Sequence, residues 1–123
     1  MAGTAVISDV FEIVWDQTAA QGNHTIANPG RAFRVIGCFG TGANNSVMTI
    51  KKNDNGGDLI CTITMENAGL GASLTDQAGI MSATASQHVL TGGDNIYIAV
   101  TAADCTRVVI QCVAAAGYAL NVT

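Results

Sequence analysis

Hydrophobic and polar residues alternate with a period of two in several short segments of the chain. Residues 31–39, RAFRVIGCF, place on one face Phe33, Val35, Gly37 and Phe39, and on the other Arg34, Ile36 and Cys38. This period, together with the aromatic and β-branched residues, predicts a strand. Residues 46–52 and 58–65 predict two further strands. The sequence NDNGG between them contains residues that tolerate positive φ, which favours a hairpin.

The second strand of this hairpin is expected to separate a core face from a solvent face. The expected core positions are Leu59, Cys61, Ile63 and Met65, with Ile60, Thr62 and Thr64 opposite. The C-terminal part continues in the same way, with strands predicted at 87–90, 96–102, 107–115 and 117–123, separated in part by the turn sequences TGGDN and ADCT. In 96–102 the inward residues are Ile96, Ile98 and Val100. In 107–115 one face carries Val108, Ile110 and Cys112, and the other carries Arg107, Val109 and Gln111.

Residues 66–85 are rich in Gly, Ala and Ser and have no lasting period. We expect a long connection between two sheets there, with one helical turn near residues 74–77. Short strands split by Gly, Asn and Asp turns, without a long helix between them, predict an all-β fold. The expected architecture is a single-domain antiparallel β-sandwich, of jelly-roll or immunoglobulin-like type, with about seven or eight strands.

The single proline, Pro29, marks a turn with Asn28 and Gly30 that separates an N-terminal segment, residues 1–28, from the sandwich, residues 29–123. Within that segment, residues 6–17 (VISDVFEIVWDQ) are dominated by β-branched and aromatic residues, which favours extended structure. Two interpretations stay open. The segment is either the first strand of the sandwich or an arm that adds to the sheet edge of a neighbour.

Both faces of that N-terminal strand are largely apolar. Phe11, Ile13 and Trp15 share one face, and Val10 and Val14 share the other. A strand that belongs only to its own core buries one face and leaves the other polar. We therefore predict that a partner covers the second face, with its register set by Asp9, Glu12 and Asp16 against basic groups. The rival interpretation is a central strand buried on both sides within one chain.

Composition narrows the possible partners. The chain has 123 residues, 49% of them hydrophobic and 11% charged, and a net charge of −4. A weakly charged surface repels neighbouring molecules little and suits self-association, for which we expect a homo-oligomer. The five basic residues form no stripe, so we expect no nucleic-acid partner. No apolar run reaches the roughly 18 residues of a membrane helix, and the N-terminus lacks a signal-peptide pattern, so synthesis in a cytoplasm is expected.

A search for catalytic chemistry finds no nucleophile motif or metal-binding spacing. His24 and His88 are expected at surface or edge positions, and the Asp residues fall in turns. NDNGGD at 53–58 resembles half of a calcium loop but lacks the downstream glutamate. We expect no enzyme activity and no cofactor or metal. Among the four cysteines we expect Cys38, Cys61 and Cys112 to be reduced and buried and Cys105 to be exposed in a turn.

These features together resemble the small decoration, or cement, proteins on the heads of tailed phages. The resemblance rests on the missing leader, the acidic segment VISDVFEIVWDQ, the strands RAFRVIGCF and DLICTITM, and the pattern GGDNIYIAVTAADCTRVVIQCVAAAG. It is one of style over most of the chain, without a diagnostic motif. Some such proteins have a Pro/Gly-rich arm, whereas residues 6–17 here are apolar.

The resemblance implies a structural virion protein on the outer surface of a phage capsid. Such a protein binds the major capsid protein, often as a trimer at local three-fold positions, and locks neighbouring capsid subunits together. The alternative function is a carbohydrate- or cell-surface-binding sandwich similar to a phage adhesin. With 5% aromatic residues, the chain offers few sugar platforms, of which Trp15, Tyr97 and Tyr118 are the candidates.

Overall fold

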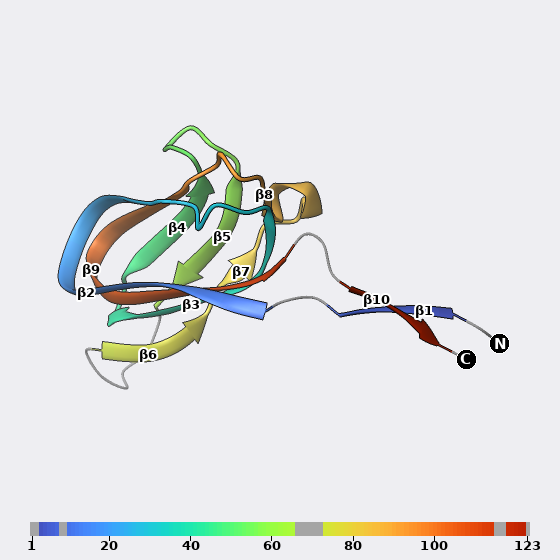
Figure 1. Cartoon of the computed structure of the whole chain (residues 1–123). Coiled ribbons are helices and arrows are strands. Elements are labelled where there is room, and N and C mark those ends of the chain that lie inside the picture. The colour runs from blue at the N-terminus through green and yellow to red at the C-terminus, as the bar shows by residue number, and fades with distance from the viewer. Residues whose placement is uncertain (1–2, 8–9, 66–72, 115–117, 123) are drawn as a thin grey trace.

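The structure is a computed structural model that describes residues 3–7, 10–65, 73–114 and 118–122. It is built almost entirely from strands (Figure 1), which are β1 (Gly3–Ile7), β2 (Val10–Ile26), β3 (Phe33–Ala43), β4 (Val47–Lys52), β5 (Leu59–Thr64), β6 (Ser73–Ala78), β7 (Ile80–Met81), β8 (Val89–Leu90), β9 (Ile96–Ala114) and β10 (Tyr118–Val122). One short 3₁₀ helix, η1 (Ala85–His88), precedes β8. In the described part of the chain, no helix is long and apolar enough to cross a bilayer.

Eight strands form one antiparallel sheet that curls around the core. Its strands follow the order β6-β3-β9-β4-β5-β7, with β2 paired to β9 and β8 paired to β3. The first and last strands of this order, β6 and β7, are consecutive in the chain and are joined by Gly79. The amide of Gly79 also donates to the carbonyl of Cys38 on β3, over 2.8 Å. The two ends of the sheet therefore meet, and the all-β prediction is confirmed with ten strands in place of seven or eight.

Strand β9 pairs with three other strands of this sheet, β2, β3 and β4. It has 19 residues and pairs with β2 along one edge, through residues 96–100, 105 and 107–113. Along the other edge, residues 96–101 pair with β4 and residues 105–114 pair with β3. We predicted two separate strands with a turn at ADCT, and this was wrong, since β9 is one strand. The turn residues lie where β9 changes partner from β4 to β3, which explains why their sequence is typical of a turn.

A β-bulge corrects the predicted faces of β3. Val35 pairs with Cys112 and Gly37 with Gln111, so Ile36 has no opposite residue on β9. The extra residue reverses the alternation. Cys38 therefore shares the buried face with Phe33 and Val35, and Ile36 is 48% exposed. The period-two prediction had placed Cys38 on the same face as Ile36 and opposite Val35, although Cys38 was expected to be buried.

The same device explains β5. Ile50 pairs with Cys61 and Lys51 with Leu59, which leaves Ile60 as the extra residue. Ile60, Cys61, Ile63 and Met65 are all fully buried. Three of the four predicted core positions are therefore confirmed, whereas Leu59 is only half-buried and Ile60 takes its place in the core. The predicted hairpin between β4 and β5 is confirmed, and Asn53 in its turn has a φ of 69°.

Two further expectations were wrong. The helical turn expected near residues 74–77 is part of strand β6, which pairs with β3. Cys105, expected to be exposed, is fully buried within β9. The other three cysteines are buried as predicted, and all four thiols are free. They belong to a core whose largest buried side chains are Phe33, Met48, Ile50, Ile60, Ile63, Met65, Leu90, Ile96, Ile98 and Ile110.

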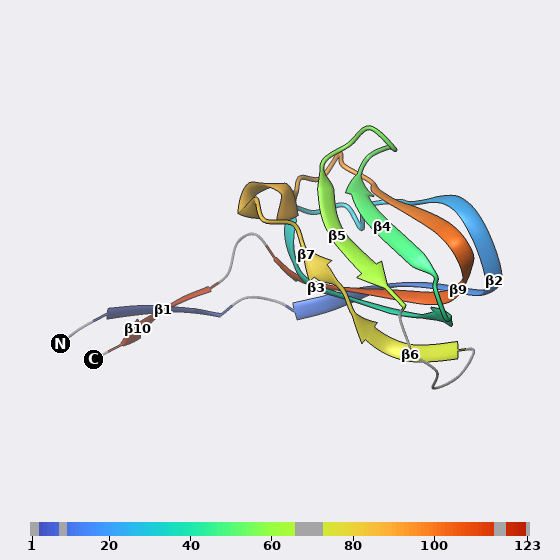
Figure 2. The same ribbon diagram turned by 180° about the vertical axis from the view of Figure 1, so that it is seen from behind.

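Strands β1 and β10 form a separate two-stranded antiparallel ribbon. Its register runs from Gly3 opposite Val122 to Ile7 opposite Tyr118. Figure 1 and the opposite view in Figure 2 show this ribbon extending from one end of the curled sheet. The strand predicted at the C-terminal end is thereby confirmed, and its partner is the N-terminal end of the chain.

Candidate interaction surface

Strands β2, β9 and β3 lie side by side and form one wall of the curled sheet. Directly opposed residues of antiparallel strands share a face. The pairings therefore arrange the outer face of this wall in four rows, which are Val10–Val113–Arg34, Glu12–Gln111–Gly37, Val14–Val109–Phe39 and Asp16–Arg107–Thr41. We call this surface the β2–β9–β3 face. Apolar and polar rows alternate across this face, and the four residues that β2 contributes to the rows are exposed.

The residues between these rows form the inner side of the wall. On β2 they are Phe11, Ile13 and Trp15, which pack against the buried core. The ring of Phe11 meets the ring of Phe33 edge-on at 5.5 Å between centroids. This geometry is a favourable one for two aromatic rings. The guanidinium of Arg31 lies over the Phe11 ring at 4.2 Å from its centroid, a favourable cation–π distance.

The structure thus separates the predicted contact residues by side. Val10, Glu12, Val14 and Asp16 are exposed, whereas the three large residues of β2 are half-buried against the core. Asp9 lies outside the described residues. Val10 is 68% exposed and Val14 44% exposed, which is inconsistent with a central strand buried on both sides. Because β2 pairs with β9 over most of its 17 residues, it is a strand of the chain's own sheet.

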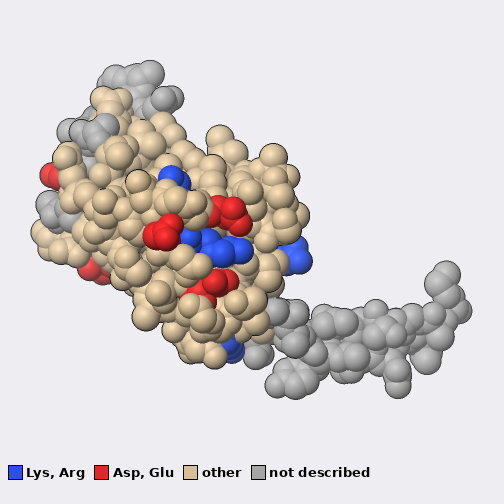
Figure 3. Space-filling view, turned by 90° about the horizontal axis from the view of Figure 1, so that it is seen from above, with Lys and Arg blue, Asp and Glu red and all other residues tan. Residues whose placement is uncertain are grey.

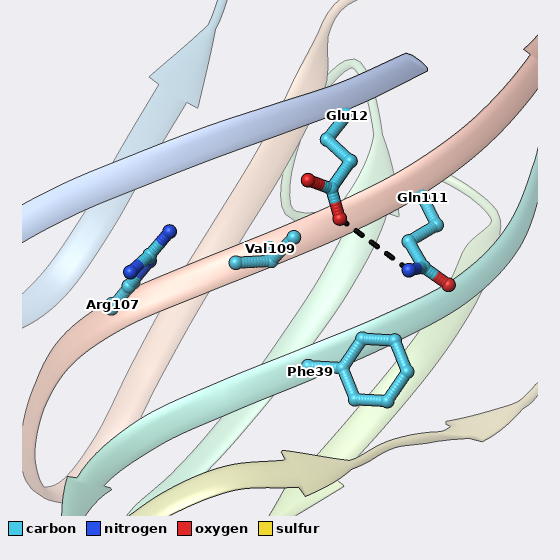
Figure 4. Close-up of a pocket in the computed structure, with 5 residues that line it drawn as sticks. All are labelled: Glu12, Phe39, Arg107, Val109 and Gln111. Carbon is cyan, nitrogen blue, oxygen red and sulfur yellow. Dashed lines mark hydrogen bonds between the residues drawn. The ribbon is translucent and has the colours of Figure 1, made fainter. Parts of the chain in front are cut away.

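A hollow of ≈ 340 Å³ lies in the middle of the β2–β9–β3 face. It is lined by Glu12, Phe39, Arg107, Val109 and Gln111 (Figure 4). The amide of Gln111 donates to the Glu12 carboxylate over 3.4 Å. Val109, 8% exposed, lies between longer neighbours. The hollow therefore combines one aromatic ring with an acid, a base and an amide, all of which can bind a polar partner.

Sequence analysis missed Phe39, Arg107, Val109 and Gln111. Glu12 and Gln111 are 99 positions apart in the chain, so only the sheet register brings them together. The available signal was the alternation in residues 107–115, which correctly placed Arg107, Val109 and Gln111 away from the core. Phe39 was assigned to the same face as Phe33 and Val35, but the bulge at Ile36 turns it to the other face of β3.

A second group of polar residues gathers where the β4–β5 hairpin meets the turn before β9. Asn53 donates to the carboxylate of Asp94 over 3.0 Å and accepts from the amide of Asn95 over 2.8 Å. Asp94 also accepts from the amide and the hydroxyl of Thr91. The amide of Asn28 donates to the carbonyl of Thr91 over 2.8 Å. These bonds join three separate loops, and we call this group the loop latch.

Residues of the calcium-like sequence NDNGGD make hydrogen bonds within the turn and the loop latch. The Asp54 carboxylate accepts from the amide of Gly56, and the side chain of Asn53 is engaged by Asp94 and Asn95. Among the described residues, no group of three or more metal-ligating side chains occurs.

Figure 3, which looks onto this end of the molecule, shows acidic side chains on either side of basic ones. The hydrogen bonds from Thr91 and Asn53 hold the pKa of Asp94 below its ordinary value of 3.8.

Three of the buried thiols, Cys38, Cys105 and Cys112, have raised pKa values that favour the neutral form. A hydrogen bond with Cys61, and then burial, raises the pKa of Cys38. Burial raises the pKa of Cys105 to about 11 and that of Cys112 to about 12. Since the thiolate is the nucleophile, these cysteines are poor candidates for catalytic or metal-binding roles.

The two histidines lie in different settings. His24 stacks on Trp15 with 4.5 Å between ring centroids, and its Nε2 atom is buried without a hydrogen-bond partner in the described chain. His88 Nε2 lies 3.2 Å from the Ser82 hydroxyl, a contact that sequence analysis did not foresee. The same nitrogen lies 2.9 Å from the carbonyl of Ser82. A carbonyl only accepts, so this Nε2 carries the proton and cannot take one from the serine hydroxyl.

Comparison with known proteins adds no further assignment. The chain matches no protein-family model, no curated protein and no solved structure.

Proposed function

We propose that the chain is a capsid decoration protein, a structural virion protein that binds the outer surface of a phage capsid and bridges major capsid proteins. The observation that carries this proposal is the exposure of Val10 and Val14 on the β2–β9–β3 face. Burial of one such side chain stabilises a contact by roughly 1.5–3 kcal/mol. Stable protein contacts combine an apolar centre with a polar rim, and the rows of this face provide both.

The charges on this face favour a protein partner over a nucleic acid. Glu12 and Asp16 lie at either side of Val14 on β2, and Arg107 lies opposite Asp16. This arrangement offers both signs of charge within one small surface, which determines orientation rather than general electrostatic attraction. A bridging role needs several contacts on one particle, and a homotrimer would supply one such face per subunit.

Particles of the phage whose genome encodes this chain provide the test. The chain is removed from purified particles, and the full-length protein is added back at increasing concentrations. Val14→Asp should weaken rebinding at least about tenfold, because a charge replaces an apolar contact. Ile80→Asp is the matched control, since Ile80 is 80% exposed but lies on β7, outside the face. Equal binding by both variants, or absence of the chain from particles, would contradict the proposal.

A second candidate function is a carbohydrate- or cell-surface-binding module. The hollow favours it, because Phe39 supplies a ring beside Glu12, Arg107 and Gln111, and sugars bind through a ring and convergent polar groups. The aromatic platforms considered from the sequence do not serve this role, since Trp15 packs on the core and Tyr97 is 8% exposed. The side chain of Tyr118 lies outside the described residues.

A glycan array separates the two candidates. If this module binds sugars, the wild-type chain labels a defined set of glycans and Phe39→Ala loses that labelling. If the chain is a decoration protein, the array stays blank while rebinding to particles remains. We propose in either case that the chain is not an enzyme, so screens for hydrolase and glycosidase activity should find none.

A further inference from the structure

The hollow on the β2–β9–β3 face has different chemistry at its two ends. Glu12 and Gln111 line one end, and Arg107 lies at the other, with Val109 between them (Figure 4). Arg107 and Gln111 are four positions apart on β9, which corresponds to about 13 Å in an extended strand. The end around Glu12 and Gln111 can therefore bind a group of its own, away from Arg107.

The negative charge of Glu12 is poorly compensated by its neighbours on the face. Within the described chain, its carboxylate accepts a hydrogen bond from the amide of Gln111 over 3.4 Å, longer than the usual N–H···O distance of about 2.7–3.2 Å. The row of Glu12 contains the neutral Gln111 and Gly37, whereas Asp16 stands directly opposite Arg107. Glu12 is thus the acid of this face that lacks a base in its own row.

Gly37 leaves space beside these two side chains. A Cβ atom at this position would lie 3.4 Å from the Oε1 atom of Gln111 and 3.7 Å from the Cε2 atom of Phe39. The nitrogen of the Gln111 amide donates to Glu12, so its oxygen remains an acceptor at the border of this space. Because Gly37 has no side chain, a bound group can reach this oxygen and the aromatic ring together.

Phe39 gives this part of the hollow an aromatic wall. Its side chain is half-buried and lines the hollow together with the buried Val109. The face of an aromatic ring attracts a cation, and the attraction increases where water is displaced. A ring, a carboxylate and an amide oxygen in one hollow are complementary to a cation that is flat and carries several N–H donors.

We infer that this hollow binds an arginine side chain of the partner protein, with the guanidinium against Phe39 and its N–H groups donating to Glu12 and to the oxygen of Gln111. A guanidinium is planar, always charged and weakly hydrated, and it stacks on aromatic rings, whereas a lysine ammonium is a compact, strongly hydrated charge. The volume of ≈ 340 Å³ is at the small end of ligand pockets, about 300–1,000 Å³, which suits one long side chain. The inference rests on the proposed function for the source of the arginine, the major capsid protein.

Titration of the isotope-labelled full-length protein with Nα-acetyl-arginine amide tests the site without a capsid. Nuclear magnetic resonance should show saturable shifts of the side-chain amide of Gln111 and of the backbone amides of Gly37 and Phe39. Nα-acetyl-citrulline amide has nearly the same shape without the charge. It should bind at least about tenfold more weakly, because the charge-assisted bonds and the cation–π contact are lost. Equal binding of the two compounds, or shifts confined to other residues, would overturn the inference.

Two variants locate the binding site within the hollow. Glu12→Gln should weaken binding of the arginine amide at least about tenfold, because the carboxylate charge is lost. Asp58→Asn is the matched control, since it removes the same charge from an exposed position before β5, outside the face, and should bind as the wild type does. Gly37→Ala should also weaken binding, because its methyl group occupies the space between Gln111 and Phe39 at ordinary contact distances.

The fluorescence of Trp15 reports whether each variant is folded. A folded Glu12→Gln variant that binds the arginine amide as tightly as the wild type would contradict the inference. A loss of binding in Asp58→Asn as large as that in Glu12→Gln would contradict it too, because the general charge of the protein would then account for the binding.

Rebinding to stripped particles separates this inference from the proposed function. Glu12→Gln and Gly37→Ala should both weaken rebinding, as Val14→Asp does. If Val14→Asp is defective while the other two variants rebind like the wild type, the face binds the capsid and the inference about the hollow is wrong. If the wild type binds the arginine amide as described but is absent from particles, the proposed function fails and the arginine site stands.

Discussion

The carboxylate of Asp94 accepts three hydrogen bonds in the loop latch. It accepts from Asn53 on one oxygen and from Thr91 on the other. An amide can accept on only one of these two atoms. Asp94→Asn should therefore lower the free energy of unfolding at neutral pH by roughly 0.5–1 kcal/mol, the range of a solvent-screened hydrogen-bonded carboxylate. Urea unfolding followed by Trp15 fluorescence measures this difference.

The same carboxylate gives a pH dependence of known sign. Because the folded pKa lies below the ordinary value of 3.8, the stabilisation is complete above that value and is lost as the pH falls below it. The difference between wild type and Asp94→Asn should shrink as the pH falls from 6 to about 3. Asp58→Asn is the control, since the Asp58 carboxylate takes no hydrogen bond within the described chain. A difference that grows on acidification would contradict the assignment.

The four cysteines provide a second prediction at this scale. All are at most 1% exposed. In the native protein none should react with a thiol reagent at pH 8, and all four should react after denaturation. Mass spectrometry of the labelled protein gives the count. Rapid labelling of Cys105 in the native state would support the exposed turn expected from its sequence and contradict its burial in β9.

The outer residues of β2 show what could be predicted at the residue level. Alternation along one strand separates Val10 and Val14 from Phe11, Ile13 and Trp15, and the structure has the same separation. Alternation cannot tell which distant residues stand beside them. Arg107 and Gln111 join the surface only through the register of β2 with β9, which is a non-local property.

At the level of elements, β-bulges are the places where the period-two pattern no longer predicts which side chains face the core. The strands around Ile36 and Ile60 were both predicted. A single extra residue on one strand then changed which side chains face the core. Whether a residue is extra depends on the length of the partner strand between the same two pairings. The local sequence of β3 or β5 does not contain that information.

At the same level, Gly79 shows how closely the junction between β6 and β7 packs against the core. It lies between β6 and β7, where the two ends of the curled sheet meet. A Cβ atom there would collide with the Cys61 sulfur and come within 2.8 Å of Ile63, both fully buried. Gly79→Ala should therefore lower the free energy of unfolding by about 1–3 kcal/mol, the usual range for overpacking.

Gly93→Ala is the control for this substitution, because a Cβ at Gly93 meets no atom within 4 Å. Thermal unfolding followed by circular dichroism should show a clear decrease for Gly79→Ala and little change for Gly93→Ala. Equal stability of the two variants would mean that the ends of the sheet do not meet closely at Gly79.

At the level of the whole molecule, the β2–β9–β3 face is the surface of the proposed contact, and the β1–β10 ribbon is a separate pair of strands. The face mixes valines with Glu12, Asp16 and Arg107, and the ribbon strands contain no charge. The all-β class could be predicted because turns and alternation are local. The ribbon could not, because it requires the pairing of the two ends of the chain, and no turn connects them.

The position of β9 late in the chain determines when the molecule can fold. Strands β2, β3 and β4 all pair with residues 96–114 of β9. During synthesis they therefore cannot complete the sheet until β9 has been made. A fold dominated by such distant pairings forms slowly and all at once. A fragment of residues 1–95 should therefore show no cooperative unfolding transition, and the full chain should refold in a single phase over milliseconds to seconds. Until β9 has been made, the apolar side chains of the earlier strands lack their partner strand, so the incomplete chain is prone to aggregation.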